Sequence, residues 1–203
     1  MLSLFHSLNM TIKTEDPCMS TPIKLAVVAA LSAVFAVGCT STPTEKNSAL
    51  TTSKTVNINL VSAEGIGQNV GQLRFTDTAN GLSIETNLTA LPPGPHGFHI
   101  HEKGSCAPAE KDGKMGAALA AGGHYNPHQS PNHGTPTTGH LGDLPLLIVD
   151  SNGVSKTTSV APRLKLSDVT GRAVMIHAGG DNYSDDPKPL GGGGDRIACG
   201  VIK

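Results

Sequence analysis

The chain has 203 residues, with 24 glycines, 14 prolines and no tryptophan, a length that suits one ordinary domain after removal of a leader. This composition favours short strands joined by turns over long helices. The formal net charge of −1 at pH 7 provides no large basic surface, so no nucleic-acid partner is expected.

Residues 1–38 are predicted to form a leader. An apolar run over residues 25–37 is too short to span a membrane but suits the core of a signal peptide. It ends in Ala-Val-Gly-Cys39, which resembles a bacterial lipoprotein signal, in which the cysteine is acylated and becomes the mature N-terminus. A plain secretory leader is the alternative. Because residues 1–18 place a polar stretch before the apolar run, Met19 is the better candidate for the true start.

The cysteines of the chain also support export. Cys18 falls in the leader and Cys39 would carry the lipid, which leaves Cys106 and Cys199 in the folded part. In an oxidising compartment two such cysteines indicate one disulfide. Two unrelated buried thiols are the alternative.

The folded part is predicted to be one domain over residues 54–203, preceded by a Ser/Thr-rich flexible tether over residues 39–53. Val56, Ile58 and Leu60 alternate with polar residues, which predicts a half-buried strand. Further along, Gly65, Gly67 and Gly71 predict a turn, and Asn80-Gly81 predicts a hairpin between strands at residues 71–75 and 82–88.

The densest group of histidines follows at residues 96–101, in an extended stretch. Residues two apart in a strand point to the same side, so His99 and His101 project together from one face. His96, Phe98 and Ile100 point the other way. Two imidazoles held side by side provide half of a four-nitrogen metal site.

The rest of the chain is predicted to contain two long loops and several short strands. Residues 102–145 are expected to be mostly irregular, with a short helical turn at 117–121, and a loop of that length is usually functional or pinned. The other loop covers residues 178–195. Strands are predicted at residues 146–149, 154–160, 173–177 and 196–202. About eight short strands with two long loops predict an all-β fold, a sandwich or a flattened barrel.

The later histidines complete two ligand sets that share one member. Four imidazoles without a sulfur ligand suit square-planar Cu(II), and they are available at His99, His101, His124 and His177. Three imidazoles and one carboxylate suit tetrahedral Zn(II), and they are available at His124, His133, His140 and Asp143. His124 belongs to both sets because an imidazole deprotonated on both nitrogens bridges two metals.

These segments resemble the copper–zinc superoxide dismutases, specifically the bacterial periplasmic branch, over about residues 55–203. The resemblance rests on four motifs, which are His-Gly-Phe-His-Ile-His-Glu-Lys-Gly-Ser-Cys (96–106), Gly-Gly-His-Tyr-Asn-Pro (122–127), Gly-His-Leu-Gly-Asp-Leu-Pro (139–145) and Gly-Gly-Gly-Gly-Asp-Arg-Ile-Ala-Cys-Gly-Val-Ile (191–202). It implies a Greek-key, eight-stranded flattened barrel, or immunoglobulin-like sandwich, with two functional loops. It also implies one copper and one zinc ion per subunit, and disproportionation of superoxide to dioxygen and hydrogen peroxide.

The resemblance assigns a role to each residue of the site. It implies that the two ligand sets hold copper and zinc and that Cys106–Cys199 is the family disulfide. In this reading His124 releases copper on reduction and carries a proton to the forming peroxide, and Arg196 pairs with the anionic substrate. Asp181 corresponds to the carboxylate that links one copper histidine to one zinc histidine.

Several alternatives stay open from the sequence. A copper or zinc carrier would expose soft ligands, and an adhesive sandwich would not need Arg196. His96 is expected to form structural hydrogen bonds, and His128 to be solvated. The resemblance places the protein in the bacterial periplasm, with membrane contact only through a lipid on Cys39, and leaves both a monomer and a homodimer open. Three lysines of the first long loop could help to attract superoxide or could be ordinary solubilising residues, namely Lys103, Lys111 and Lys114.

Overall fold

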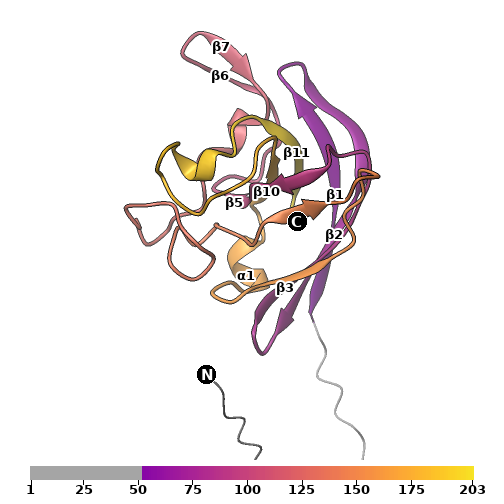
Figure 1. Ribbon diagram of the computed structural model, residues 1–203, viewed down its shortest axis with the longest axis vertical. Helices are drawn as coiled ribbons and strands as arrows, with labels where there is room; N and C mark the ends of the chain where they lie inside the picture. Colours follow the sequence, from indigo (N-terminus) through magenta and orange to yellow (C-terminus); the bar gives the residue numbers. More distant parts are fainter. Residues whose placement is uncertain (1–51) are drawn as a thin grey trace, which may run out of the picture. The chain divides into compact units, whose positions relative to one another are not determined.

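The computed structural model describes residues 52–203 (Figure 1). The predicted leader, Cys39 and almost all of the predicted tether lie outside these residues. Within the described part, no helix is both long enough and apolar enough to cross a membrane.

Seven antiparallel strands form the main sheet, in the order β5-β10-β11-β1-β2-β3-β9. Their bounds are Ser53–Ser62 for β1, Gly65–Thr78 for β2, Gly81–Leu88 for β3, Phe98–His101 for β5, Thr158–Ala161 for β9, Ala173–His177 for β10 and Arg196–Val201 for β11. A second sheet pairs β4 (Gly94–His96) with β8 (Leu147–Val149). Because only Gly97 separates β4 from β5, the two count as one interrupted strand that joins both sheets. The eight strands so obtained confirm the predicted all-β barrel.

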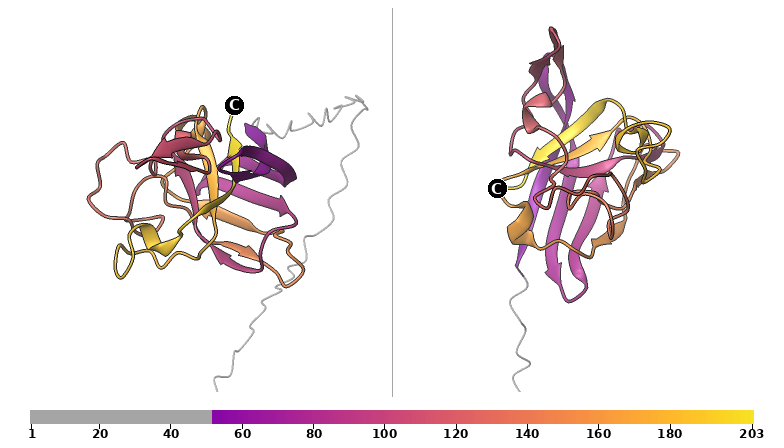
Figure 2. Two further views of the ribbon diagram at one scale, coloured as in Figure 1. Left: turned by 90° about the horizontal axis from the view of Figure 1, so that it is seen from above. Right: turned by 90° about the vertical axis from the view of Figure 1, so that its left-hand side faces the viewer.

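Both long loops lie on the same side of the barrel, away from the wall formed by β1, β2 and β3 (Figures 1 and 2). The short helical segments lie in the connections between strands. They are the 3-10 helices η1 (Leu119–Ala121) and η2 (Leu190–Gly192) and the single-turn helix α1 (Leu166–Val169). The helical turn predicted at residues 117–121 is confirmed by η1.

The turn predicted at Gly65, Gly67 and Gly71 is wrong, because all three glycines lie within β2. The pairing of β1 with β2 shifts register beside Gly71, whose φ is 128°. A Cβ atom at Gly71 would lie 2.1 Å from the carbonyl oxygen of Asn87 on β3. Glycine therefore allows a bulge and a close backbone approach at this position, which is a common use of glycine inside strands.

The first long loop contains a hairpin where irregular chain was expected. Strand β6 (Ala109–Lys111) pairs with β7 (Lys114–Gly116). Asp112 and Gly113 connect them with positive φ angles of 53° and 76°, the conformation that an Asp-Gly pair favours in a two-residue hairpin. The Asp-Gly dipeptide was therefore a usable signal for this hairpin.

The barrel interior explains which side chains of β5 and β10 reach the loops. Phe98 and Ile100 of β5, and Val174 and Ile176 of β10, are buried in the main apolar cluster. Each such side chain stabilises the fold by about 1.5–3 kcal/mol. The alternate residues, among them His99 and His101, therefore face the loop side. The alternation predicted for both strands is confirmed.

Candidate metal centre

Backbone pairing brings the first loop against β5. Isolated β-bridges join His101 to His124 and His99 to Asp143. On the other edge of β5, the strand β10 pairs with it and ends in His177. These residues are all buried. Local strand geometry and two long-range bridges thus gather histidines from three segments.

The first cluster is made of four imidazoles. The ligand atoms of His99, His101, His124 and His177 all lie within 4.8 Å of one another. Four buried ring nitrogens have no hydrogen-bond partner in the described part of the chain, namely His99 Nδ1, His101 Nε2, His124 Nε2 and His177 Nε2. Buried polar atoms in proteins are nearly always paired. Four unpaired nitrogens in one cluster therefore fit a bound metal ion.

Two of the opposite ring nitrogens are held by the backbone. His101 Nδ1–H donates to the carbonyl of Gly122 at 2.9 Å, and His177 Nδ1–H donates to that of Gly194 at 3.1 Å. A carbonyl can only accept, so these bonds leave each Nε2 as a free acceptor. Such bonds fix the orientation and tautomer of a ligand.

The second cluster surrounds Asp143. Its Oδ1 atom lies 3.0 Å from His124 Nδ1, 3.0 Å from His133 Nδ1 and 3.5 Å from His140 Nδ1. Ligands placed 2.0 Å from a tetrahedral ion are separated by about 3.3 Å. The Nδ1 atoms of His133 and His140 are buried and lack hydrogen-bond geometry to any partner among residues 52–203. The donor set and its spacing therefore fit zinc.

His99 lies beside this second cluster as well. Its ligand atoms fall within 4.8 Å of those of His124, His133 and Asp143, and its ring stacks on that of His124 with centroids 3.9 Å apart. Its Nε2 atom is occupied, however, by a hydrogen bond to Asp181. His124 alone directs one ring nitrogen toward each cluster.

Asp181 links the two clusters through hydrogen bonds to one histidine of each. It accepts hydrogen bonds from His99 Nε2 at 2.7 Å and from His133 Nε2 at 2.8 Å. Burial opposes its ionisation, but the hydrogen bonds from His133 and His99 outweigh burial and hold the pKa of Asp181 well below its usual range. The carboxylate stays charged and fixes both rings.

The two clusters differ in protonation before metal binds. Burial lowers the pKa of His99 to about 3 and that of His177 to about 4. Burial would also lower the pKa of His133, but the carboxylate of Asp143, 3.0 Å from its Nδ1 atom, and that of Asp181, hydrogen-bonded to its Nε2 atom, raise it to about 9. His99 and His177 of the first cluster are therefore neutral at pH 7, whereas the second cluster holds the His133 imidazolium between two carboxylates.

Zinc binding to the metal-free protein near pH 7 is expected to release about one proton per ion, because the ion displaces the proton of His133. Zinc affinity should fall about tenfold per pH unit below about pH 9, whereas His99 and His177 of the first cluster should add no such dependence down to about pH 5. Calorimetric titration in buffers of different ionisation enthalpy measures this release. Zinc uptake without proton release would contradict it.

The same interaction affects the stability of the metal-free fold. The pKa of His133 is raised from 6.5 to about 9 on folding. Its contribution to stability is therefore complete below pH 6.5 and is lost as the pH rises through about 9.

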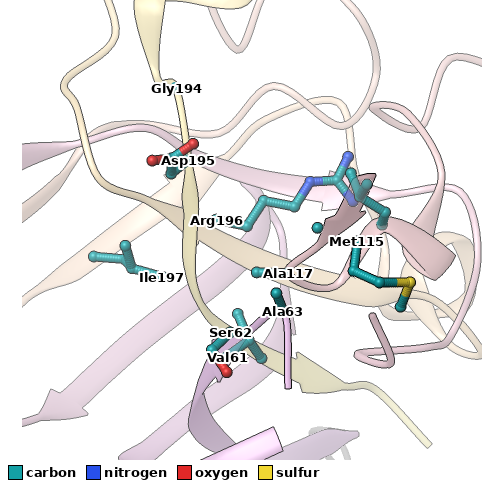
Figure 3. A pocket seen from close by; sticks show the side chains of 11 residues that line it. Val61, Ser62, Ala63, Met115, Ala117, Gly194, Asp195, Arg196 and Ile197 are labelled. Carbon is teal, nitrogen blue, oxygen red and sulfur yellow. The ribbon is translucent and has the colours of Figure 1, made fainter. Parts of the chain in front are cut away.

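Arg196 opens strand β11 next to the clusters. Its guanidinium donates to the carbonyls of Ala118 at 2.6 Å and Gly122 at 2.7 Å. Burial lowers the pKa of Arg196 from its usual value, but a guanidinium stays charged at neutral pH. Figure 3 shows the side chain extending from β11 toward the segment that carries Met115, beside a pocket of about 550 Å³.

The predicted disulfide is confirmed. Cys106 and Cys199 are bonded, with their Cα atoms 5.7 Å apart, and they stand 93 positions apart in the sequence. The bond ties the loop after β5 to strand β11, three residues beyond Arg196.

The two other histidines of the described residues behave as expected. The ring nitrogens of His96 lie 2.7 Å from the carbonyl oxygens of His177 and Pro92, and His128 is exposed. Sequence reasoning missed Asp185, whose carboxylate accepts the backbone N–H groups of His133 and Leu190, both at 2.9 Å. Asp185 ties the two long loops together, and no motif marks it because its partners are main-chain atoms.

A β-barrel with two adjoining histidine clusters that share one imidazole defines a metalloprotein with a two-ion centre. The family model described as copper/zinc superoxide dismutase (SODC) matches residues 69–202. The chain is 55% identical over 153 residues to superoxide dismutase [Cu-Zn] of Escherichia coli K12, covering 74% of this chain and 88% of that protein.

Solved structures of similar proteins lead to the same family. That of the Cu/Zn superoxide dismutase from Brucella abortus has a TM-score of 0.73 and 50% identity, covering 75% of this chain and 100% of that one. The solution structure of the monomeric copper, zinc superoxide dismutase from Salmonella enterica has a TM-score of 0.68 and 55% identity, with the same coverage. The chain belongs to the copper/zinc superoxide dismutase family, whose cofactors are copper and zinc.

Proposed function

We propose that this protein disproportionates superoxide to dioxygen and hydrogen peroxide, with one copper and one zinc ion per subunit. The observation that carries the proposal is the pair of buried clusters with unpaired nitrogens that meet at His124. The proposed copper ligands are His99, His101, His124 and His177. The proposed zinc ligands are His124, His133, His140 and Asp143.

The protein's own residues orient the ligands, attract the anionic substrate and move protons. When bound, copper supplies one-electron chemistry by cycling between two oxidation states, while zinc supplies a fixed charge next to His124. The Nε2 atom of His124 holds a proton during the reducing half of the cycle and delivers it to the peroxide as a general acid. The second proton comes from solvent. Arg196 attracts and pairs with the anion.

The test is superoxide removal by the purified protein loaded with both metals. Metal-free protein is the matched control, and a rapid-mixing or pulse-radiolysis assay follows the decay of superoxide. Activity that appears only with metals supports the proposal. A metal carrier or an adhesive protein would remain inert even when both metals are bound.

Replacing Arg196 with glutamine is expected to lower the second-order rate by about tenfold at low ionic strength and by less at high ionic strength, because salt screens the lost charge. Arg196→Lys should fall between the two. Copper content must be measured alongside, since Gly122 accepts from both Arg196 and His101. Lys156→Gln, a change at an exposed position that precedes β9, is the control. If Arg196→Gln and the unmodified protein reacted at equal rates at every salt concentration, this role of Arg196 would be contradicted.

The enzyme works, in this proposal, in the bacterial periplasm, attached to a membrane by a lipid on Cys39. The apolar run before Cys39 and a disulfide typical of oxidising compartments support this location. Mass spectrometry of the mature N-terminus is the test, and a free amine without added lipid mass would contradict the anchor. A monomer suffices for activity, because one chain supplies every proposed ligand together with Asp181 and Arg196. Sedimentation would detect a homodimer.

A further inference from the structure

We propose that Arg163 is a positioning residue for His140, acting on the backbone of the loop that carries this ligand. The inference rests on the proposed function, because it takes His140 as a zinc ligand. Arg163 lies in the connection between β9 and α1 and does not belong to either histidine cluster.

The guanidinium of Arg163 is committed to three carbonyl oxygens of one short segment. Its Nε–H donates to Pro136 at 2.7 Å, and its Nη2 donates to Gly139 at 3.0 Å and to His140 at 2.7 Å. Among the described residues no carboxylate forms an ion pair with it. The cation is therefore paired with loop backbone alone.

The segment needs such a partner because it is a tight turn. The N–H groups of Thr138 and Gly139 both donate to the carbonyl of Thr135, each at 3.0 Å. Of the three carbonyls that Arg163 binds, that of His140 also accepts the N–H of Asp143 at 3.2 Å, whereas those of Pro136 and Gly139 have no backbone donor among the described residues. A planar, multidentate guanidinium satisfies several of them at once, whereas a lysine ammonium of similar length cannot match this fork.

The other side of the same segment is held by Asp143. Its Oδ2 atom accepts the N–H groups of His140 at 2.8 Å and Gly134 at 3.0 Å. A Cβ atom at Gly139 would lie 2.2 Å from this oxygen. The Gly139–His140 backbone is therefore clamped between Asp143 on one side and Arg163 on the other.

His140 depends on this clamp more than its neighbours do. Its side chain is 12% exposed, compared with 0% for His133 and 2% for His124. Its Nδ1 atom also lies farthest from Asp143 Oδ1, at 3.5 Å. With less packing around the ring, backbone hydrogen bonds must fix its direction.

Zinc release from the fully loaded protein tests the inference. With the chelating dye 4-(2-pyridylazo)resorcinol as the zinc acceptor, Arg163→Gln should lose zinc about tenfold faster than the unmodified protein. Arg163→Lys should lie between them, and copper release should stay unchanged. With Co(II) in the zinc site, the visible bands of Arg163→Gln should shift, reporting altered ligand geometry. Arg74→Gln, at an exposed arginine of β2, is the matched control.

His140→Ala separates failure of the inference from failure of the ligand assignment. If His140→Ala leaves zinc release and the cobalt spectrum unchanged, the proposed ligand set is wrong. If His140→Ala speeds zinc loss but Arg163→Gln matches Arg74→Gln, the inference about Arg163 is overturned and the ligand set stands. Equal acceleration of copper and zinc loss would indicate general loosening and would also overturn it. Should Arg163→Gln fail to fold, Arg163→Lys is judged by the same criteria.

Discussion

His124→Ala is expected to lower the rate of superoxide disproportionation by about 100-fold or more at neutral pH, the range lost with a general acid. The variant should keep part of its copper, because His99, His101 and His177 remain. Zinc should bind more weakly, because one of its four proposed ligands is absent. The loss follows from the position of His124, which alone directs a ring nitrogen toward each cluster.

The measurement combines a rate with a metal content. Superoxide decay is followed for protein whose copper and zinc have been quantified, so that lost activity is not confused with lost metal. His128→Ala is the matched control, since His128 lies four positions away and is exposed. A variant that retains copper and dismutates superoxide at an undiminished rate would rule out the shared-imidazole mechanism.

Removal of the disulfide should have the largest effect on stability. The bond joins residues separated by 93 positions, and the chain-entropy model gives about 4–5 kcal/mol for a loop of this length as an upper value. The double variant Cys106→Ala/Cys199→Ala should therefore lose about 3–4 kcal/mol in free energy of unfolding. Urea denaturation of the metal-free protein measures the difference.

The same variant should also lose activity under conditions where it remains folded. Cys199 lies on β11 close to Arg196, and Cys106 precedes the segment whose carbonyls hold that guanidinium. Without the disulfide, strand β11 and the segment whose carbonyls bind Arg196 are no longer covalently joined. Unmodified protein reduced with dithiothreitol is the control and should behave like the double variant. An unchanged urea midpoint would show that the cross-link contributes nothing.

Short-range pattern was enough to predict the strands that build the site. Alternation with a period of two directs Phe98 and Ile100 into the core and His99 and His101 out of it, and the same rule holds for β10. The pattern failed where tertiary contact decides the conformation. Gly71 was predicted to be a turn residue. Glycine is required there because the backbone of β3 lies close by, and a local sequence pattern does not show this contact.

The path of the first long loop was the harder problem. Its ligands are recognisable as residue types, but the bridges that place His124 and Asp143 against β5 join positions far apart in sequence. Asp185 and Arg163 escaped notice because they bind main-chain atoms, which every residue has. The hairpin β6–β7 could have been predicted from Asp112-Gly113.

The carbonyl of Gly122 accepts hydrogen bonds from His101 and from Arg196. Because this acceptor is a main-chain atom, no side-chain replacement at position 122 can delete it. Replacement is also disfavoured there, since φ is 77° and a Cβ atom would lie 2.5 Å from Glu102 Oε2. One peptide unit thus positions both the His101 ring of the first histidine cluster and the guanidinium of Arg196, through an acceptor that side-chain mutation cannot remove.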